Sequence, residues 1–177
     1  TTGFDYVKDR ILCIGAVVLQ NNTISIHDSF EVYIQQEHYD KTTAKIHGIL
    51  KDFALDKPNE LQVLQQFLTF LGDSIIIAHH TVFDVTMINK ALERNGLPSL
   101  TNKSLDTAVL YKKTLIVSHL FESKDTYSLD ELADKYDISI KDRHTALGDA
   151  YITAIAFLKI IKKLEAKKIT TLKQLFK

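Results

Sequence analysis

Apolar residues recur along the chain with two different periods, which separate the expected strands from the expected helices. Residues 11–19 form a short apolar run rich in β-branched side chains, typical of a buried strand. After the turn residues Asn21 and Asn22, apolar side chains alternate with mainly polar ones from Ile24 to Ile34, which indicates a half-buried strand. We expect these two strands to pair as an antiparallel hairpin.

Helical spacing of apolar residues follows the hairpin. Leucines and phenylalanines repeat at this spacing over residues 61–71, shortly after Pro58, and Gly72 marks the end of that helix. Residues 74–78 then form a second run of buried-strand character. The pattern therefore predicts a helix followed closely by a strand.

The rest of the chain continues the alternation of strands and helices. A helix over about residues 82–94 ends at the Asn-Gly pair 95–96, and residues 105–115 fit either a strand or a helix. An S-x-x-E capping box at 128–131 opens another helix, and the last long helix spans about 145–163. A hairpin followed by alternating strands and helices predicts a mixed α/β sheet with helices packed on it.

Composition and charge limit the class of protein. The 177 residues are 45% hydrophobic and 25% charged, which fits one globular domain over residues 1–177 and not a disordered chain. No apolar run approaches the ~20 residues that span a bilayer, and no secretory signal is visible. The single cysteine, Cys13, fits a reducing compartment, so we expect a cytoplasmic protein without a membrane segment.

Net charge narrows the possible binding modes. The 22 basic residues balance the 22 acidic ones, which argues against non-specific, charge-driven binding along a nucleic-acid duplex. It does not argue against a site that grips a single phosphate through metal ions, because the ions then supply the positive charge.

Two aspartates lie on helix faces whose other members are mostly apolar. Asp84 shares a face with Ile88, and Asp149 shares one with Thr153 and Phe157. A buried, unpaired carboxylate is costly, so each needs a cation, a hydrogen-bond donor or a cleft. Both also lie near a helix N-terminus, where negative charge is favoured, and for either aspartate alone this explanation is as good as a functional one.

The neighbours of these aspartates add chemistry. Asp84 follows a buried strand, and ligands collect where the strands of α/β sheets end. Asp149 follows His144 by five residues, and Gly148 beside it indicates close backbone packing in that helix. An imidazole just ahead of a carboxylate-bearing helix suits a general base beside a metal site.

His79 and His80 form another grouping with Asp84, which would define an unrelated metal hydrolase. Zinc sites generally require three or four convergent ligands, whereas adjacent residues on an extended segment point to opposite faces. We keep this grouping as an alternative that substitution of His79 would test.

Several segments of the chain carry motifs in a fixed order. They are Thr1-Thr2-Gly3, residues 10–17, Ile46-His47-Gly48-Ile49, Ala78 to Asp84 (AHHTVFD), Leu105-Asp106-Thr107, and Arg143 to Ala150 (RHTALGDA). In order and spacing they resemble the DEDDh 3′–5′ exonucleases, the group that includes the proofreading (epsilon) subunit of bacterial DNA polymerase III and ribonuclease T. Thr1-Thr2-Gly3 resembles the end of the motif D-x-E-T-T-G. The segment from Ala78 to Asp84 resembles the motif H-N-x-x-F-D, with His80 in place of Asn. The segment from Arg143 to Ala150 resembles the motif H-x₄-D.

The resemblance implies a ribonuclease H-like fold, a five-stranded mixed sheet flanked by helices whose first three strands form a meander. It also implies two divalent ions, Mg²⁺ or Mn²⁺, held by four carboxylates, of which Asp84 and Asp149 would be two. His144 would deprotonate the attacking water, and the 3′-terminal nucleotide would leave as a 5′-monophosphate.

The same resemblance implies contacts with the terminal nucleotide from Thr1, His47 and Phe83. For Phe83, a plain role as a core aromatic side chain remains an equally good interpretation. The expected partner is a single-stranded 3′ end of DNA or RNA. The sequence leaves open whether the domain acts alone, as a homodimer, or beside a DNA polymerase or other domains of a longer chain.

The chain begins at Thr1, directly after the place where the first Asp and Glu of the family would stand. We therefore expect a strand ending in Asp-x-Glu ahead of Thr1 in the native protein, and weak metal binding without detectable exonuclease activity for residues 1–177 alone. The expected function is a metal-dependent 3′–5′ exonuclease. The alternative is an inactive nuclease-fold module that binds nucleic acid or acts as a scaffold.

Overall fold

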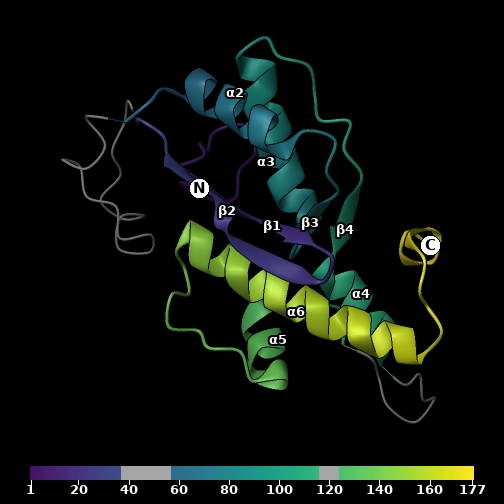
Figure 1. The fold of residues 1–177 in the computed structure, drawn as a ribbon. Helices are drawn as coiled ribbons and strands as arrows, with labels where there is room; N and C mark the ends of the chain where they lie inside the picture. The colour runs from purple at the N-terminus through teal and green to yellow at the C-terminus, as the bar shows by residue number, and fades with distance from the viewer. Residues whose placement is uncertain (37–56, 116–123) are drawn as a thin grey trace.

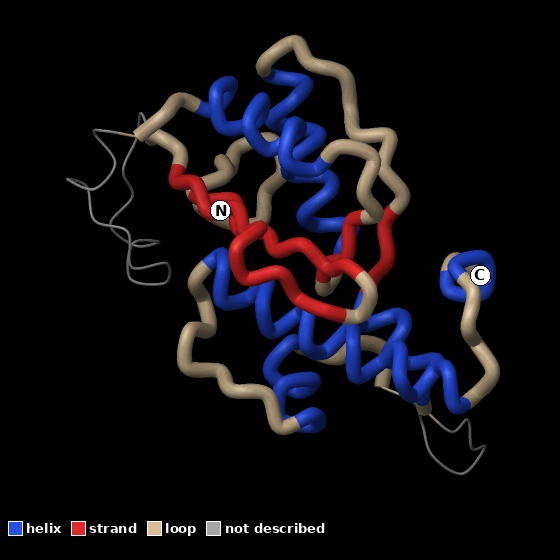
Figure 2. The backbone as a smooth tube through the Cα atoms, in the orientation of Figure 1, coloured by secondary structure: helices blue, strands red, loops and turns tan. Residues whose placement is uncertain are grey.

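The elements of the computed structural model follow the hydrophobic pattern of the chain (Figures 1 and 2). The structure describes residues 1–36, 57–115 and 124–177. Within these ranges the elements are β1 (Cys13–Gln20), β2 (Thr23–Tyr33), α2 (Glu60–Leu71), β3 (Ile76–Ala78), α3 (Thr81–Arg94), β4 (Ser104–Asp106), α4 (Thr107–Thr114), α5 (Leu129–Tyr136), α6 (Ala146–Ala166) and α7 (Leu172–Leu175).

Strands β1 and β2 form the expected antiparallel hairpin. Their register pairs Cys13 with Tyr33 at one end and Gln20 with Thr23 at the turn. Asn21 and Asn22 both have positive φ, 50° and 60°, as a tight hairpin turn requires at its two central residues. Asparagine tolerates this conformation, so the turn fixes the register.

Strands β3 and β4 form a second, parallel pair in which Ile77 lies opposite Leu105. Helix α3 connects them, as a parallel pair requires. In the described part of the chain, β1 pairs only with β2 and β3 only with β4, so the expected five-stranded sheet is seen there as two two-stranded sheets. The strand expected ahead of Thr1 stays a prediction.

The strands lie between two groups of helices (Figure 1). On one side, α2 and α3 pack on the hairpin around residues such as Phe30, Phe67 and Leu92. On the other side, α4, α5 and α6 share a core with β4 that includes Leu132 and Ile160, both fully buried. Helix α6 also crosses β1, which brings its N-terminal end against the hairpin.

Several local expectations are confirmed, and one element was not predicted. Ser128 and Glu131 form the reciprocal capping box at the start of α5. Residues 105–115, which fitted either a strand or a helix, contain the end of β4 and all of α4. The short helix α7 was not predicted, because four residues give no readable period. None of the described helices is long and apolar enough to span a membrane.

Candidate active site

Asp84 lies in the first turn of α3, and the end of β4 fixes where that turn begins. His80 precedes the helix in the left-handed conformation, with φ 60° and ψ 49°, and its own side chain caps nothing. Instead, the Asp106 carboxylate accepts hydrogen bonds from the backbone N–H groups of Thr81 at 2.9 Å and His80 at 3.3 Å. It also accepts one from Ala108 at 2.8 Å, so one side chain caps both α3 and α4.

Asp84 has an electrostatic environment that disfavours its charge. Burial raises the pKa of its carboxyl to about 6, and the negative charges of Asp106 and, more weakly, Asp149 act in the same direction. Asp84 and Asp149, predicted separately from helical patterns, therefore belong to the same region of the fold. A buried carboxyl with further carboxylates in its surroundings is stabilised in its charged form by a cation.

Two glycines allow the backbone to approach the first turn of α6, where Asp149 lies. A Cβ on Gly148 would clash with the carbonyl oxygen of Asp142, and a Cβ on Gly15 of β1 would clash with the backbone of Ala146. The close packing expected at Gly148 is therefore confirmed. Together the two contacts hold the start of α6 against both the hairpin and the loop before it.

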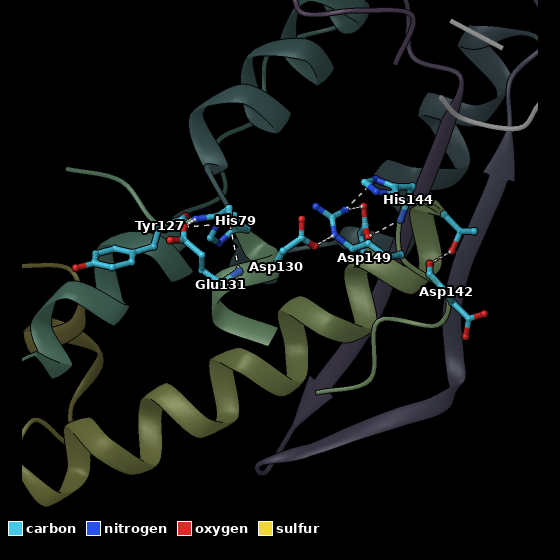
Figure 3. Close-up of polar contacts among 10 residues, drawn as sticks. His79, Tyr127, Asp130, Glu131, Asp142, His144 and Asp149 are labelled. Carbon is cyan, nitrogen blue, oxygen red and sulfur yellow. Dashed lines mark hydrogen bonds and ion pairs between the residues drawn. The ribbon is translucent and has the colours of Figure 1, made fainter. Parts of the chain in front are cut away.

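Both carboxylate oxygens of Asp149 accept hydrogen bonds from the two residues before the N-cap of α6 (Figure 3). Oδ2 accepts from Nη1 of Arg143 at 2.7 Å, and Oδ1 accepts from the backbone N–H of His144 at 3.1 Å. His144 adopts a positive φ of 71°, and its side chain is exposed to solvent. The structure therefore brings the expected general base next to the expected metal ligand.

Arg143 is the residue of this site that the sequence did not single out. Its Nε donates to Oδ1 of Asp130 at 2.6 Å, while its Nη1 is held by Asp149. Burial acts to lower the pKa of the guanidinium, but the hydrogen bond to Asp130 and the charge of Asp149 outweigh it, so the pKa is raised. Arg143 therefore stays charged between the two carboxylates.

His79 has a structural role that explains why it is not available as a ligand. Its Nδ1 lies 2.9 Å from Oγ1 of Thr107, and its Nε2 lies 2.8 Å from the carbonyl oxygen of Tyr127. Burial, followed by the charge of His80, lowers the pKa of the imidazole, so the neutral form is favoured. With both ring nitrogens engaged, the geometry disfavours the alternative metal grouping of His79, His80 and Asp84.

The carboxylates of Asp84 and Asp149 fit a hard divalent cation by their chemistry. Mg²⁺ prefers oxygen ligands and usually binds through one or two carboxylates together with water and substrate phosphates. Among the residues that the structure describes, no three His, Cys, Asp or Glu side chains are placed to hold a metal ion. The role of Asp84 and Asp149 as metal ligands therefore stays a prediction.

The expected nucleotide contacts are divided between described and undescribed parts of the chain. His47 lies outside the described residues. Thr1 lies in the neighbourhood of Asp84. The half-buried ring of Phe83 lies 5.7 Å from those of Phe4 and Tyr6, between ring centroids.

Phe4 is a second residue that sequence analysis missed. It is 86% exposed, although its ring rests against Phe83. An exposed aromatic face of this kind suits stacking with a nucleobase. The sequence carried no signal for Phe4 beyond its position just after Thr1-Thr2-Gly3, because its exposure is known only from the structure.

Relatives of known kind match almost the whole chain. The exonuclease family RNase_T matches residues 1–157. The DNA polymerase III PolC-type protein of Caldanaerobacter subterraneus subsp. tengcongensis is 33% identical over 166 residues, which are 93% of this chain and 11% of that protein. The DNA polymerase III subunit epsilon of Aquifex aeolicus is 30% identical over 164 residues, 92% of this chain and 77% of the relative. The chain thus spans only a small part of the PolC-type relatives.

Solved structures share the fold. Exonuclease X in complex with 5′ overhanging duplex DNA aligns with a TM-score of 0.72 at 20% identity, covering 99% of this chain and 92% of that one. E. coli Exonuclease I in complex with a dT13 oligonucleotide aligns with a TM-score of 0.78 at 17% identity, covering 94% of this chain and 40% of that one. These likenesses confirm the expected α/β, ribonuclease H-like fold.

Proposed function

We propose that this chain, which belongs to the RNase_T exonuclease family, is a metal-dependent domain that removes nucleotides from a nucleic-acid 3′ end. The observation that carries the proposal is the placement of Asp84 and Asp149 in the first turns of α3 and α6. Asp149 is among the charges that raise the pKa of Asp84, and His144 lies beside Asp149. The 3′–5′ direction is taken from the group that the motifs resemble.

The ligands and the base would divide the chemistry between them. Two Mg²⁺ or Mn²⁺ ions, when bound, would stabilise the attacking and leaving oxygens of the phosphodiester. Asp84 and Asp149 would hold these ions. The exposed imidazole of His144 would accept the proton of the attacking water, whose oxygen bonds to phosphorus while the 3′ oxygen of the preceding nucleotide leaves. The product is a nucleoside 5′-monophosphate.

The backbone around His144 supports this assignment. Its N–H donates to Oδ1 of Asp149, so the position of the base depends directly on the carboxylate next to it. Its side chain faces solvent, where a substrate phosphate and water have access. A general base in this position is ready to act once a 3′ end lies against Asp84 and Asp149.

The aromatic residues near the start of the chain would orient the last nucleotide. Phe83 is held by its contacts with Phe4 and Tyr6, and the exposed face of Phe4 offers a stacking surface. We include Thr1 and His47 in the same role on the strength of the motif resemblance. Stacking accepts any base, which suits an enzyme that acts on every terminal nucleotide.

We propose DNA as the substrate and a DNA polymerase as the partner. The matching relatives are named as DNA polymerase III proteins, and the two solved neighbours described above were each bound to DNA. A 3′–5′ exonuclease beside a polymerase would remove the nucleotide just added. Residues 1–177, together with the strand expected ahead of Thr1, would then form a single exonuclease domain.

An inactive binding module is the second candidate function. It is favoured by the finding that, among the described residues, no three His, Cys, Asp or Glu side chains are placed to hold a metal ion. Such a module would bind a single-stranded 3′ end through its aromatic residues without hydrolysing it. Binding without product formation, in the presence of Mg²⁺, would identify this case.

The proposed function is tested on the chain extended upstream of Thr1 by the expected Asp-x-Glu strand, with single-stranded DNA of one sequence in three forms. A 5′-labelled strand should shorten one nucleotide at a time, a 3′-labelled strand should release its label at once as a mononucleotide, and a circular strand should stay intact. EDTA should stop both reactions. Cutting of the circle, or loss of nucleotides from the 5′ end first, would contradict the proposal, and an RNA strand of the same sequence measures the preference for DNA.

A further inference from the structure

The guanidinium of Arg143 joins two carboxylates that belong to different helices (Figure 3). Its Nη1 donates to Oδ2 of Asp149 at 2.7 Å, in the first turn of α6. Its Nε donates to Oδ1 of Asp130 at 2.6 Å, in the first turn of α5. The proposed metal ligand is thus linked, through one cation, to a carboxylate that has no place in the proposed metal site.

The two ends of this bridge differ in their access to solvent. The side chain of Arg143 is 19% exposed and that of Asp149 is 33% exposed, whereas that of Asp130 is 56% exposed. A largely buried guanidinium needs a partner at all times, because leaving it unpaired costs far more than separating an exposed pair. Asp130 keeps such a partner available even if Asp149 is taken by another cation.

The remaining contacts of Asp149 show which oxygen is contested. Oδ1 is used by the backbone N–H of His144, a neutral donor. Oδ2 is used by Arg143, a full positive charge. A divalent ion at Asp149 and the guanidinium of Arg143 would therefore compete for the same negative charge. Oδ2 is the oxygen for which both would compete.

We propose that Arg143 is a positioning residue that neutralises Asp149 in the metal-free chain and shifts onto Asp130 alone when a divalent cation binds. This inference rests on the proposed function, in which Asp149 is a metal ligand. It assigns opposite effects to two neighbouring residues. Arg143 weakens cation binding by competing for Asp149, and Asp130 restores part of that binding by holding the released guanidinium.

The test is calorimetric titration of Mn²⁺ into the wild-type chain and its variants, with circular dichroism to verify that each is folded. Arg143→Ala should bind Mn²⁺ about five- to tenfold more tightly, because the competitor is gone. Asp130→Asn should bind it about two- to fivefold more weakly, because the guanidinium then has only Asp149. A merely structural role predicts weaker binding in both variants.

Three further variants make the result decisive. Arg143→Gln has an uncharged side chain of similar length and should also bind Mn²⁺ more tightly than wild type. It replaces Arg143→Ala in the test if that variant folds poorly. Arg143→Lys keeps the positive charge but cannot donate to two carboxylates with the fixed geometry of a guanidinium. Its affinity for Mn²⁺ should lie between those of wild type and Arg143→Ala. In Arg143→Ala/Asp130→Asn the loss caused by the Asp130 change should disappear, because there is no guanidinium left to hold.

The outcomes separate this inference from the proposed function. If Asp149→Asn weakens Mn²⁺ binding but neither Arg143→Ala nor Arg143→Gln strengthens it, Asp149 is a ligand and the competition by Arg143 is wrong. If Asp149→Asn leaves Mn²⁺ binding unchanged, the ligand assignment fails and this inference fails with it.

Discussion

The backbone N–H of Thr81 donates a 2.9 Å hydrogen bond to Oδ2 of Asp106, and this contact joins the end of β4 to the first residue of α3. The same carboxylate caps α4 through Ala108. Because Asp84 lies one turn into α3, the position of one proposed metal ligand depends on a side chain that binds no metal. Asp106, which the sequence showed only as part of a motif segment, is thus a structural support for the site.

The first prediction follows from this double cap. Asp106→Ala should lower the free energy of unfolding by about 2–4 kcal/mol, since a lost N-cap typically costs about 1–2 kcal/mol and two helices lose theirs. Urea unfolding followed by circular dichroism measures the change. Asp125→Ala, at an exposed loop position, is the matched control and should stay within about 0.5 kcal/mol of wild type. Equal stability of the two variants would contradict the cap.

The second prediction concerns Gly148. Alanine there would force backbone atoms apart, because its Cβ would clash with the carbonyl oxygen of Asp142 and with Oγ1 of Thr145. Gly148→Ala should therefore destabilise the chain by about 2–3 kcal/mol. Gly96→Ala is the control: its φ of 68° is left-handed, but nothing lies near its Cβ, so it should lose only about 1 kcal/mol. A smaller loss at Gly148 than at Gly96 would contradict the packing.

The sequence predicted those parts of the fold that repeat over several residues. Alternation over β2, with two asparagines before it, was enough for the hairpin, and the S-x-x-E pattern was enough for the start of α5. Strand β4 has three residues, too few to show a period, so its stretch remained ambiguous. Strand β3 is equally short, but it lies within a continuous run of apolar residues and was predicted, so the apolar run and not the length decided the outcome.

Long-range pairings in the site were the part that the sequence did not predict. Arg143 and Asp130 are separated by 13 residues, and no spacing rule connects them. The bond between His79 and the carbonyl of Tyr127 spans 48 residues. Asp84, Asp149 and His144 were selected as candidates because helical patterns and motif spacing identify single residues. Their partners become visible only when the helices are packed together.

The third prediction is a pH dependence of stability that comes from His79. Its pKa is lowered in the folded chain, mainly by burial, so the unfolded chain binds a proton more readily. Above the pKa of the unfolded chain, about 6.5, the imidazole is neutral in both states and causes no loss of stability. Stability should decrease as the pH falls through that value towards the lower pKa of the folded chain. Urea unfolding at about pH 8 and about pH 5.5 should show the loss in wild type and a smaller one in His79→Asn. An identical loss in both would contradict this assignment.

The fourth prediction separates the base from the metal ligands. His144→Ala should reduce nuclease activity about a hundredfold or more, as expected for a lost general base, while Mn²⁺ binding stays near wild type. His27→Ala, on the exposed face of β2, is the matched control and should retain both properties. Loss of Mn²⁺ binding together with the imidazole would instead make His144 a metal ligand.

The joint role of Asp84 and Asp149 is the central claim, and one assay tests it most directly. In a form of the chain extended upstream of Thr1 by the expected Asp-x-Glu strand, hydrolysis of a single-stranded DNA 3′ end in Mg²⁺ should be compared for four proteins. They are wild type, Asp84→Asn, Asp149→Asn and Asp142→Asn, an exposed aspartate in the loop before α6. The account predicts at least about a hundredfold loss of rate in the first two variants with the fold intact, and none in Asp142→Asn. Near wild-type activity in Asp84→Asn or Asp149→Asn would contradict it.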